Sequence, residues 1–167
     1  MQIKGIKDED FVNYKKPSMF IITPTCSFKC DKENGCNLCQ NSHLAHVPTI
    51  NIDTDKLIQR YIDNPITKAI VFGGLEPLDT FDELLDFVHR ARYHYNITDD
   101  IVIYTGYTEE EVISHPIWNV LLMQYDNIVV KFGRFRPNQD PHYDNVLGVK
   151  LASNNQYAKK YNYEVAQ

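Results

Sequence analysis

Four short segments of the chain are continuously apolar, and helix-like patterns lie between them. The segments are residues 19–23, 69–72, 100–104 and 127–132. A strand that is apolar at almost every position is buried on both faces, which is typical of parallel sheets. Strands that alternate with helices therefore predict an α/β fold with a mostly parallel sheet.

Helix signals between these segments support the same fold class. Asp53 or Thr54 is placed to cap a helix that ends at Asn64, just before a proline. Residues 80–83 and 108–111 both have the Thr-x-x-Glu pattern of a capping box, so each predicts the start of a further helix. Each of these helices would connect one strand to the next.

The two ends of the chain carry weaker patterns. Residues 1–16 are mostly polar and are predicted to form a leading arm. Residues 134–167 are predicted to be an irregular C-terminal segment with one short strand near 146–151. A length of 167 residues suits a single domain, so residues 1–167 are expected to form one unit.

Composition excludes several classes of protein. Apolar residues make up 43% of the chain and charged residues 23%, which favours a packed globular domain over disorder. The net charge of −5 argues against a nucleic-acid partner, because phosphate binding needs a basic surface. No segment has the length of a membrane span, and the N-terminus lacks a signal-peptide pattern. A cytoplasmic protein with no membrane association is therefore expected.

All four cysteines lie close together in the segment after the first apolar run: Cys26, Cys30, Cys36 and Cys39. A secreted disulfide scaffold spreads its cysteines over the fold, so this grouping indicates a metal or redox site in a reducing compartment. A zinc site with four cysteines is one alternative. A redox pair at Cys36 and Cys39 is another. The third is an iron–sulfur cluster held by three cysteines, which leaves one iron open.

A further zinc alternative uses histidines. Cys36 and Cys39 with His43 and His46 would give a two-cysteine, two-histidine set, although the spacing is crowded.

Glycine-rich or polar loops follow each of the other apolar segments. They are residues 73–77, 105–107 and 133–135. In parallel α/β folds the ligand site lies beyond the carboxyl ends of the strands. These three loops and the cysteine segment are therefore expected to meet at one edge of the sheet.

Two of these loops carry a recognisable combination. Cys26-x3-Cys30 follows the first strand and Gly-Gly-x-Glu-Pro (73–77) follows the second. With residues 103–108, 131–135 and 152–156 in the same order, the chain resembles the radical S-adenosylmethionine (SAM) superfamily. More narrowly it resembles the activating proteins of anaerobic ribonucleoside-triphosphate reductase. The resemblance implies a compact partial (βα) barrel.

The resemblance also implies a [4Fe–4S] cluster. Its ligands would be Cys26, Cys30 and Cys39, with the third displaced by an insertion relative to the family spacing Cys-x3-Cys-x2-Cys. Cys36 would then be a spare residue inside the insertion. The alternative keeps Cys36 and Cys39 as ligands and drops Cys26 or Cys30.

SAM is the second cofactor that the resemblance implies. Gly73, Gly74 and Glu76 would hold its methionine end. Thr105 would lie near the sugar or adenine, and Leu38 would offer an apolar surface to the adenine.

The activity implied is reductive cleavage of SAM followed by formation of a glycyl radical on a partner enzyme such as anaerobic ribonucleotide reductase. A flavodoxin or a ferredoxin-type protein would supply the electron. A radical SAM enzyme that acts on a small molecule, and a non-enzymatic zinc-binding adaptor, are the alternatives.

Overall fold

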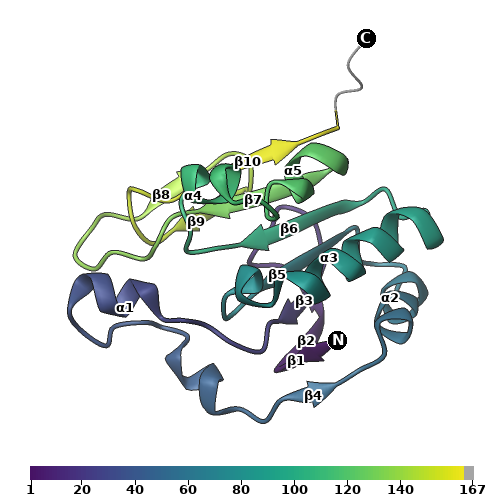
Figure 1. The fold of residues 1–167 in the computed structure, drawn as a ribbon, viewed down its shortest axis with the longest axis horizontal. Helices are drawn as coiled ribbons and strands as arrows, with labels where there is room; N and C mark the ends of the chain where they lie inside the picture. The colour runs from purple at the N-terminus through teal and green to yellow at the C-terminus, as the bar shows by residue number, and fades with distance from the viewer. Residues whose placement is uncertain (164–167) are drawn as a thin grey trace.

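A six-stranded sheet forms the centre of the molecule in the computed structural model, which describes residues 1–163. The strand order is β10-β7-β6-β5-β3-β2 (Figure 1). The inner four strands are parallel, and the two outer strands run antiparallel to their neighbours. The strands are β2 (Gly5–Asp10), β3 (Ser18–Ile22), β5 (Ala69–Gly73), β6 (Asp100–Tyr104), β7 (Ile128–Phe132) and β10 (Tyr157–Tyr161).

The parallel centre of the sheet confirms the α/β prediction. β3, β5, β6 and β7 are the four apolar segments, and nearly all of their residues are buried. They are buried because both faces of the sheet are covered, and every residue of β5 and β7 is buried. Alternating polarity is absent for the same reason.

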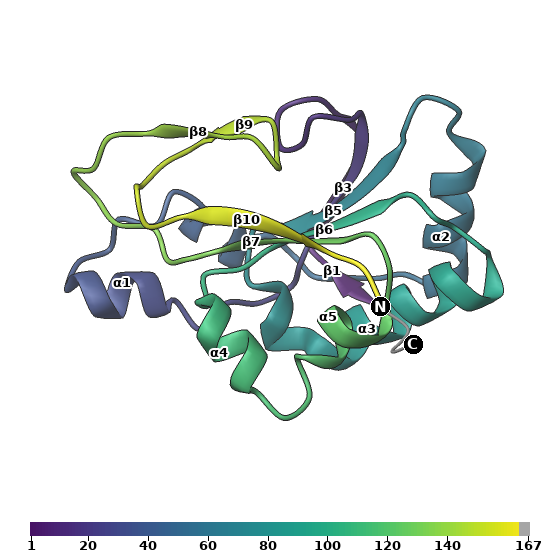
Figure 2. The ribbon, with the colours of Figure 1, turned by 90° about the horizontal axis from the view of Figure 1, so that it is seen from above.

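Helices connect the parallel strands in chain order. Their bounds are α1 (Lys29–Asn34), α2 (Thr54–Asp63), α3 (Phe81–His89), α4 (Glu109–Ser114) and α5 (Val120–Gln124). Successive right-handed crossovers in one direction place their helices on the same face of a sheet. In Figure 2, α3, α4 and α5 lie on one side of the sheet, and the hairpin of β8 (His142–Asp144) and β9 (Val149–Leu151) lies on the other.

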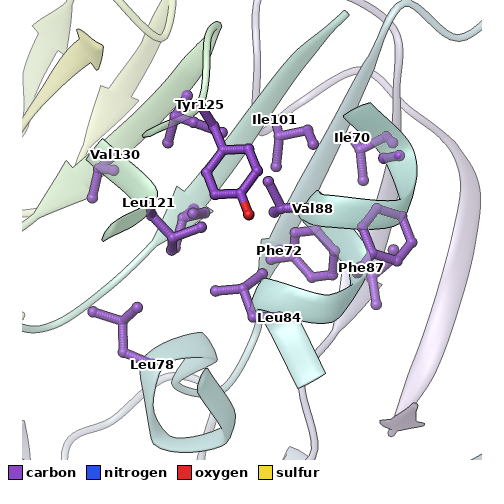
Figure 3. Close-up of a cluster of buried hydrophobic side chains, with 14 of the residues drawn as sticks. Ile70, Phe72, Leu78, Leu84, Phe87, Val88, Ile101, Leu121, Tyr125 and Val130 are labelled. Atoms are coloured by element: carbon purple, nitrogen blue, oxygen red, sulfur yellow. The ribbon is translucent and has the colours of Figure 1, made fainter. Parts of the chain in front are cut away.

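The larger hydrophobic core lies between the sheet and the helices (Figure 3). Phe72 of β5 and Phe87 of α3 meet edge to face, with ring centroids 5.0 Å apart. Such aromatic pairs add to the stabilisation from burial alone. A smaller core on the opposite face packs β5, β6 and β7 against Tyr14 and the β8–β9 hairpin.

All three predicted helix starts are confirmed, because α2, α3 and α4 begin at Thr54, Phe81 and Glu109. The Asp53 side chain accepts a hydrogen bond from the Lys56 amide, 3.0 Å away, and Thr108 forms a capping box with Glu111. The capping box predicted at 80–83 is wrong. The Glu83 carboxylate instead accepts from the Gln2 amide at 2.9 Å, because the N-terminal strand lies beside this helix start.

The N-terminal segment is part of the folded domain, so the prediction of a leading arm over residues 1–16 is wrong. β1 (Gln2–Ile3) pairs with β4 (Ile50–Asn51), and β2 pairs with β3. β2 is an edge strand with several exposed positions, so its sequence is polar. The polar pattern gave no strand signal for that reason.

The C-terminal segment also holds more strand than predicted for residues 134–167. β9 lies within the short strand expected near 146–151, but β8 and β10 were not predicted. β10 has polar residues because it is the opposite edge of the sheet, and Lys159 and Lys160 lie on it. The last four residues of this predicted segment, 164–167, lie outside the described part.

None of the helices in residues 1–163 combines the length and the apolar character needed to cross a bilayer.

Candidate functional site

A cavity of about 460 Å³ opens at the carboxyl edge of the parallel strands. All four loops predicted to meet there contribute to its wall, which confirms that they converge. The arrowheads of β6 and β7 in Figure 1 point towards the side of the molecule where α1 lies. The wall includes Cys26, Cys30, Cys39, Gly74, Glu76, Thr105, Gly106, Lys131, Gly133 and Gln156.

Hydrogen bonds tie these loops to one another. The Glu76 amide donates to the Thr25 carbonyl at 2.9 Å. The Asp79 carboxylate accepts from the Ser27 amide at 2.7 Å and from the Tyr107 hydroxyl at 2.8 Å. The cysteine segment is therefore fixed to the loops after β5 and β6 before any ligand binds.

Glu76 is a buried carboxylate that lines the cavity. One oxygen accepts from the Leu78 amide at 3.0 Å and the Thr105 hydroxyl at 2.8 Å, and the other accepts from the Gly106 amide at 2.8 Å. Burial raises the pKa of Glu76 to about 7, against the opposing effect of these hydrogen bonds. The loops after β5 and β6 are thus joined through one ionisable group.

Lys131 brings a buried ammonium to the same cavity. Its Nζ donates to the Gly133 carbonyl at 2.9 Å, the one hydrogen bond this ammonium makes within residues 1–163. An ammonium has three donors, so two remain available to a ligand. Burial lowers the pKa of Lys131 to about 8, while nearby Glu76 favours the charged form. A cation with unused donors in a cavity suits an anionic ligand group.

The local fold of residues 29–39 explains the unusual cysteine spacing. Helix α1 ends at Asn34 and is followed by its C-cap Gly35, whose φ of +67° is the left-handed conformation that glycine adopts without strain. The Asp31 carboxylate then accepts from the amides of Leu38 and Cys39, at 3.0 and 2.9 Å. This turn returns Cys39 to the cavity. Cys36, whose thiol donates to the Asn34 carbonyl at 3.4 Å, is absent from the cavity wall.

Two of the cavity thiols, those of Cys26 and Cys30, favour their protonated form. Burial raises the pKa of Cys26 to about 12, and burial also raises the pKa of Cys30. Thiolates are the form that binds metals, so metal binding here must displace protons.

The three cysteines surround the cavity without meeting at one point. Within residues 1–163 no three His, Cys, Asp or Glu side chains are close enough to hold a single metal ion. Cys26, Cys30 and Cys39 nevertheless line the same hollow. Soft thiolates spaced around a hollow fit a bulky iron–sulfur group, which takes cysteine ligands at several irons.

Two predicted ligand-contacting residues lie away from the cavity wall. Leu38 has 48% of its surface exposed and does not line the cavity. Gly73 ends β5, where its carbonyl accepts from the Thr23 amide at 3.0 Å, and Gly74 is the glycine that faces the hollow. Gly74, Glu76 and Thr105 are brought together with the three cysteines.

Several cavity residues were given no role from the sequence. Lys131 had a usable signal, because a charged residue inside an otherwise apolar strand needs a partner. Asn13 and Lys150 had no such signal, whereas Gln156 lies in the segment 152–156 that contributes to the family resemblance. They come from the two end segments, which reach the cavity only through the pairing of β2 and the placement of the β8–β9 hairpin.

Comparison with known proteins supplies the family. A family model described as "4Fe-4S single cluster domain" matches residues 18–157. No curated protein and no solved structure matches the chain. The match begins at β3, takes in every cysteine and ends at the first residue of β10, and the cavity with three thiols suits the cluster that the family description names. The chain belongs to the 4Fe-4S single cluster domain family.

Proposed function

We propose that the chain is a radical SAM activase that carries a [4Fe–4S] cluster and forms a glycyl radical on a partner enzyme. The domain of this family is found in radical SAM-type proteins. The observation that carries the proposal is the sharing of one cavity by Cys26, Cys30 and Cys39 with Glu76 and Lys131. A site for the cluster alone would not need a buried carboxylate and a buried ammonium beside it.

The bound cluster would supply the electron that cleaves the SAM sulfonium to methionine and a 5′-deoxyadenosyl radical. Cys26, Cys30 and Cys39 would hold it and leave one iron open for the ligand. The protein's own task is to orient SAM and to exclude water. The three hydrogen bonds to the Glu76 carboxylate fix its position, so that it can orient the ligand.

The charges in the cavity match the methionine end of SAM, which carries both an ammonium and a carboxylate. Lys131 has two donors to offer the carboxylate. Glu76 offers negative charge nearby, and Gly74 lets the backbone approach closely because it has no Cβ.

The partner and the electron donor extend the proposal through the resemblance at residues 103–108, 131–135 and 152–156. The partner would be a glycyl radical enzyme of the anaerobic ribonucleotide reductase kind, and the donor a flavodoxin or ferredoxin-type protein. The radical would take a hydrogen atom from a glycine Cα of the partner and become 5′-deoxyadenosine. A cytoplasmic location and a partial (βα) barrel belong to the same proposal.

The test is made on anaerobically purified protein, reconstituted with iron and sulfide, reduced and mixed with SAM. We expect an iron–sulfur absorption spectrum and the formation of 5′-deoxyadenosine, measured by chromatography. Adding a glycyl radical enzyme should give the electron paramagnetic resonance doublet of a glycyl radical. Cleavage without that doublet would favour a small-molecule substrate. A colourless protein with tightly bound zinc would contradict the proposal.

Replacing Lys131 with methionine is expected to weaken SAM binding about ten- to hundred-fold, because a charge-assisted hydrogen bond to the carboxylate is lost. Cluster content should stay unchanged. Lys150→Met is the matched control, since Lys150 also lines the cavity but is exposed. Equilibrium binding of SAM to the oxidised, cluster-loaded protein is the measurement. Equal affinities for the two variants would remove Lys131 from the binding site.

A further inference from the structure

Helix α1 carries Cys30 but has no hydrophobic anchor. None of its residues is buried. Helices usually dock by burying an apolar face, and isolated helices of this length are unstable in water. Polar contacts with the rest of the domain must therefore hold α1 at the edge of the sheet.

Two of those polar contacts are made with the loop that follows β7. Arg134 Nε lies 3.0 Å from a carboxylate oxygen of Glu33, and the Asn34 side chain donates to the Phe135 carbonyl at 3.0 Å. Arg134 Nε donates no hydrogen bond within residues 1–163, so its attraction to Glu33 is a charge contact. The Lys29 ammonium also lies over the Tyr107 ring, 4.3 Å from its centroid.

Arg134 is itself rigidly held from the other side. Both terminal nitrogens of its guanidinium donate to the Glu111 carboxylate at 2.8 Å, the paired geometry that fixes both groups. Glu111 also accepts from the Thr108 amide in the capping box of α4. The Arg134 side chain is only 9% exposed, so its position is set by the folded sheet edge.

Arg134 also lies close to Cys30. Both line a small pocket beneath the cysteine segment. A Cβ at Gly106 would lie 3.5 Å from the Cys30 sulfur and 3.6 Å from Arg134 Cγ, so the two side chains meet around this glycine. A shift of α1 away from Arg134 would therefore carry Cys30 away from the cavity.

We propose that Arg134 is a positioning residue. Its charge contact with Glu33, called here the Arg134–Glu33 clasp, holds α1 at the sheet edge and so holds Cys30 in place for the cluster. This inference rests on the proposed function only in taking Cys30 as a cluster ligand. It does not depend on SAM cleavage. Because Glu33 is 55% exposed, salt should weaken the clasp.

The test has two readouts on the full chain. Hydrogen exchange of the metal-free protein reports how firmly α1 is held, and the half-life of the reconstituted cluster under an iron chelator reports what that does to the site. Glu33→Gln should raise amide exchange in α1 and shorten the cluster half-life, each about two- to five-fold. Arg134→Gln should have the larger effect, about ten-fold, because it removes the paired hydrogen bonds to Glu111 as well as the contact with Glu33.

The matched control is Glu110→Gln, which makes the same charge change at an exposed position with no ion pair among the described residues. We expect exchange in β5, β6 and β7 to be unchanged in every variant, which separates a local effect from misfolding. Wild-type cluster half-life should also shorten at high salt, whereas that of Arg134→Gln should not.

If amide exchange in α1 of Glu33→Gln and Arg134→Gln equals that of Glu110→Gln, the clasp is overturned. Looser α1 with an unchanged cluster half-life would overturn the role in positioning Cys30. If the variants change α1 exchange and cluster half-life as expected but the protein does not cleave SAM, only the proposed function is refuted.

Discussion

Cys30→Ser is expected to abolish cluster binding, so iron in the reconstituted protein should fall from about four atoms per chain to near zero. A serine hydroxyl is a far poorer ligand for iron than a thiolate, and Cys30 is one of the three cysteines on the cavity wall. SAM cleavage should be lost with the cluster. The fold should survive, because Cys30 is only partly buried and lies outside both hydrophobic cores. Iron and sulfide analysis with circular dichroism checks both expectations.

Cys36→Ser is the matched control for this experiment. Cys36 makes one thiol hydrogen bond to Asn34 and does not line the cavity, so its loss should leave the cluster in place. A Cys36→Ser variant that loses its cluster, while Cys26→Ser or Cys30→Ser retains it, would assign Cys36 as a ligand. That result would favour the alternative ligand set, in which Cys36 and Cys39 bind the cluster and Cys26 or Cys30 does not.

Gly74→Ala is expected to destabilise the metal-free protein by roughly 2–4 kcal/mol. The φ of Gly74 is +79°, a conformation that strains any residue with a Cβ. The added Cβ would also lie 2.7 Å from Ile22 Cγ2 and 3.2 Å from Leu44 Cδ1. Ile22 ends β3, so the loop that carries Glu76 cannot move aside without disturbing the sheet. Urea unfolding measures the loss.

Gly35→Ala separates the two causes of this effect. Gly35 has a similar φ of +67°, but a Cβ there meets nothing within 4 Å. It should therefore cost only the backbone strain, about 1–2 kcal/mol. Equal losses for the two variants would show that the contact with Ile22 is relieved by a small shift. In the cluster-loaded protein we also expect Gly74→Ala, and not Gly35→Ala, to weaken SAM binding.

The parallel part of the fold could be predicted from residue patterns because its causes are local. Val71 and Phe72 lie in a segment that is apolar throughout, and a strand with both faces covered has no solvent-facing positions to mark. The capping box at Thr108 depends on residues three positions apart, so it too is visible in the sequence. The capping box expected at Thr80 failed because Gln2, a distant residue, competes for the Glu83 carboxylate.

The edges of the sheet could not be predicted in the same way. Strand β2 has exposed positions, and β10 places Lys159 and Lys160 at the other edge, so neither carries an apolar pattern. Their pairing depends on the neighbouring strand, which is remote in sequence. The same pairing and the β8–β9 hairpin bring Asn13, Lys150 and Gln156 to the cavity.

The sequence alone determined the fold class, the grouping of the cysteines and the loops that meet at the carboxyl edge of the sheet. These follow from apolar runs and from short motifs whose residues are neighbours in the chain. Only the tertiary structure decided which cysteines share a cavity, because the turn organised by Asp31 returns Cys39 and leaves Cys36 aside. It also placed the charge of Lys131 beside Glu76 and Arg134 against α1, since each of these contacts joins segments that only folding brings together.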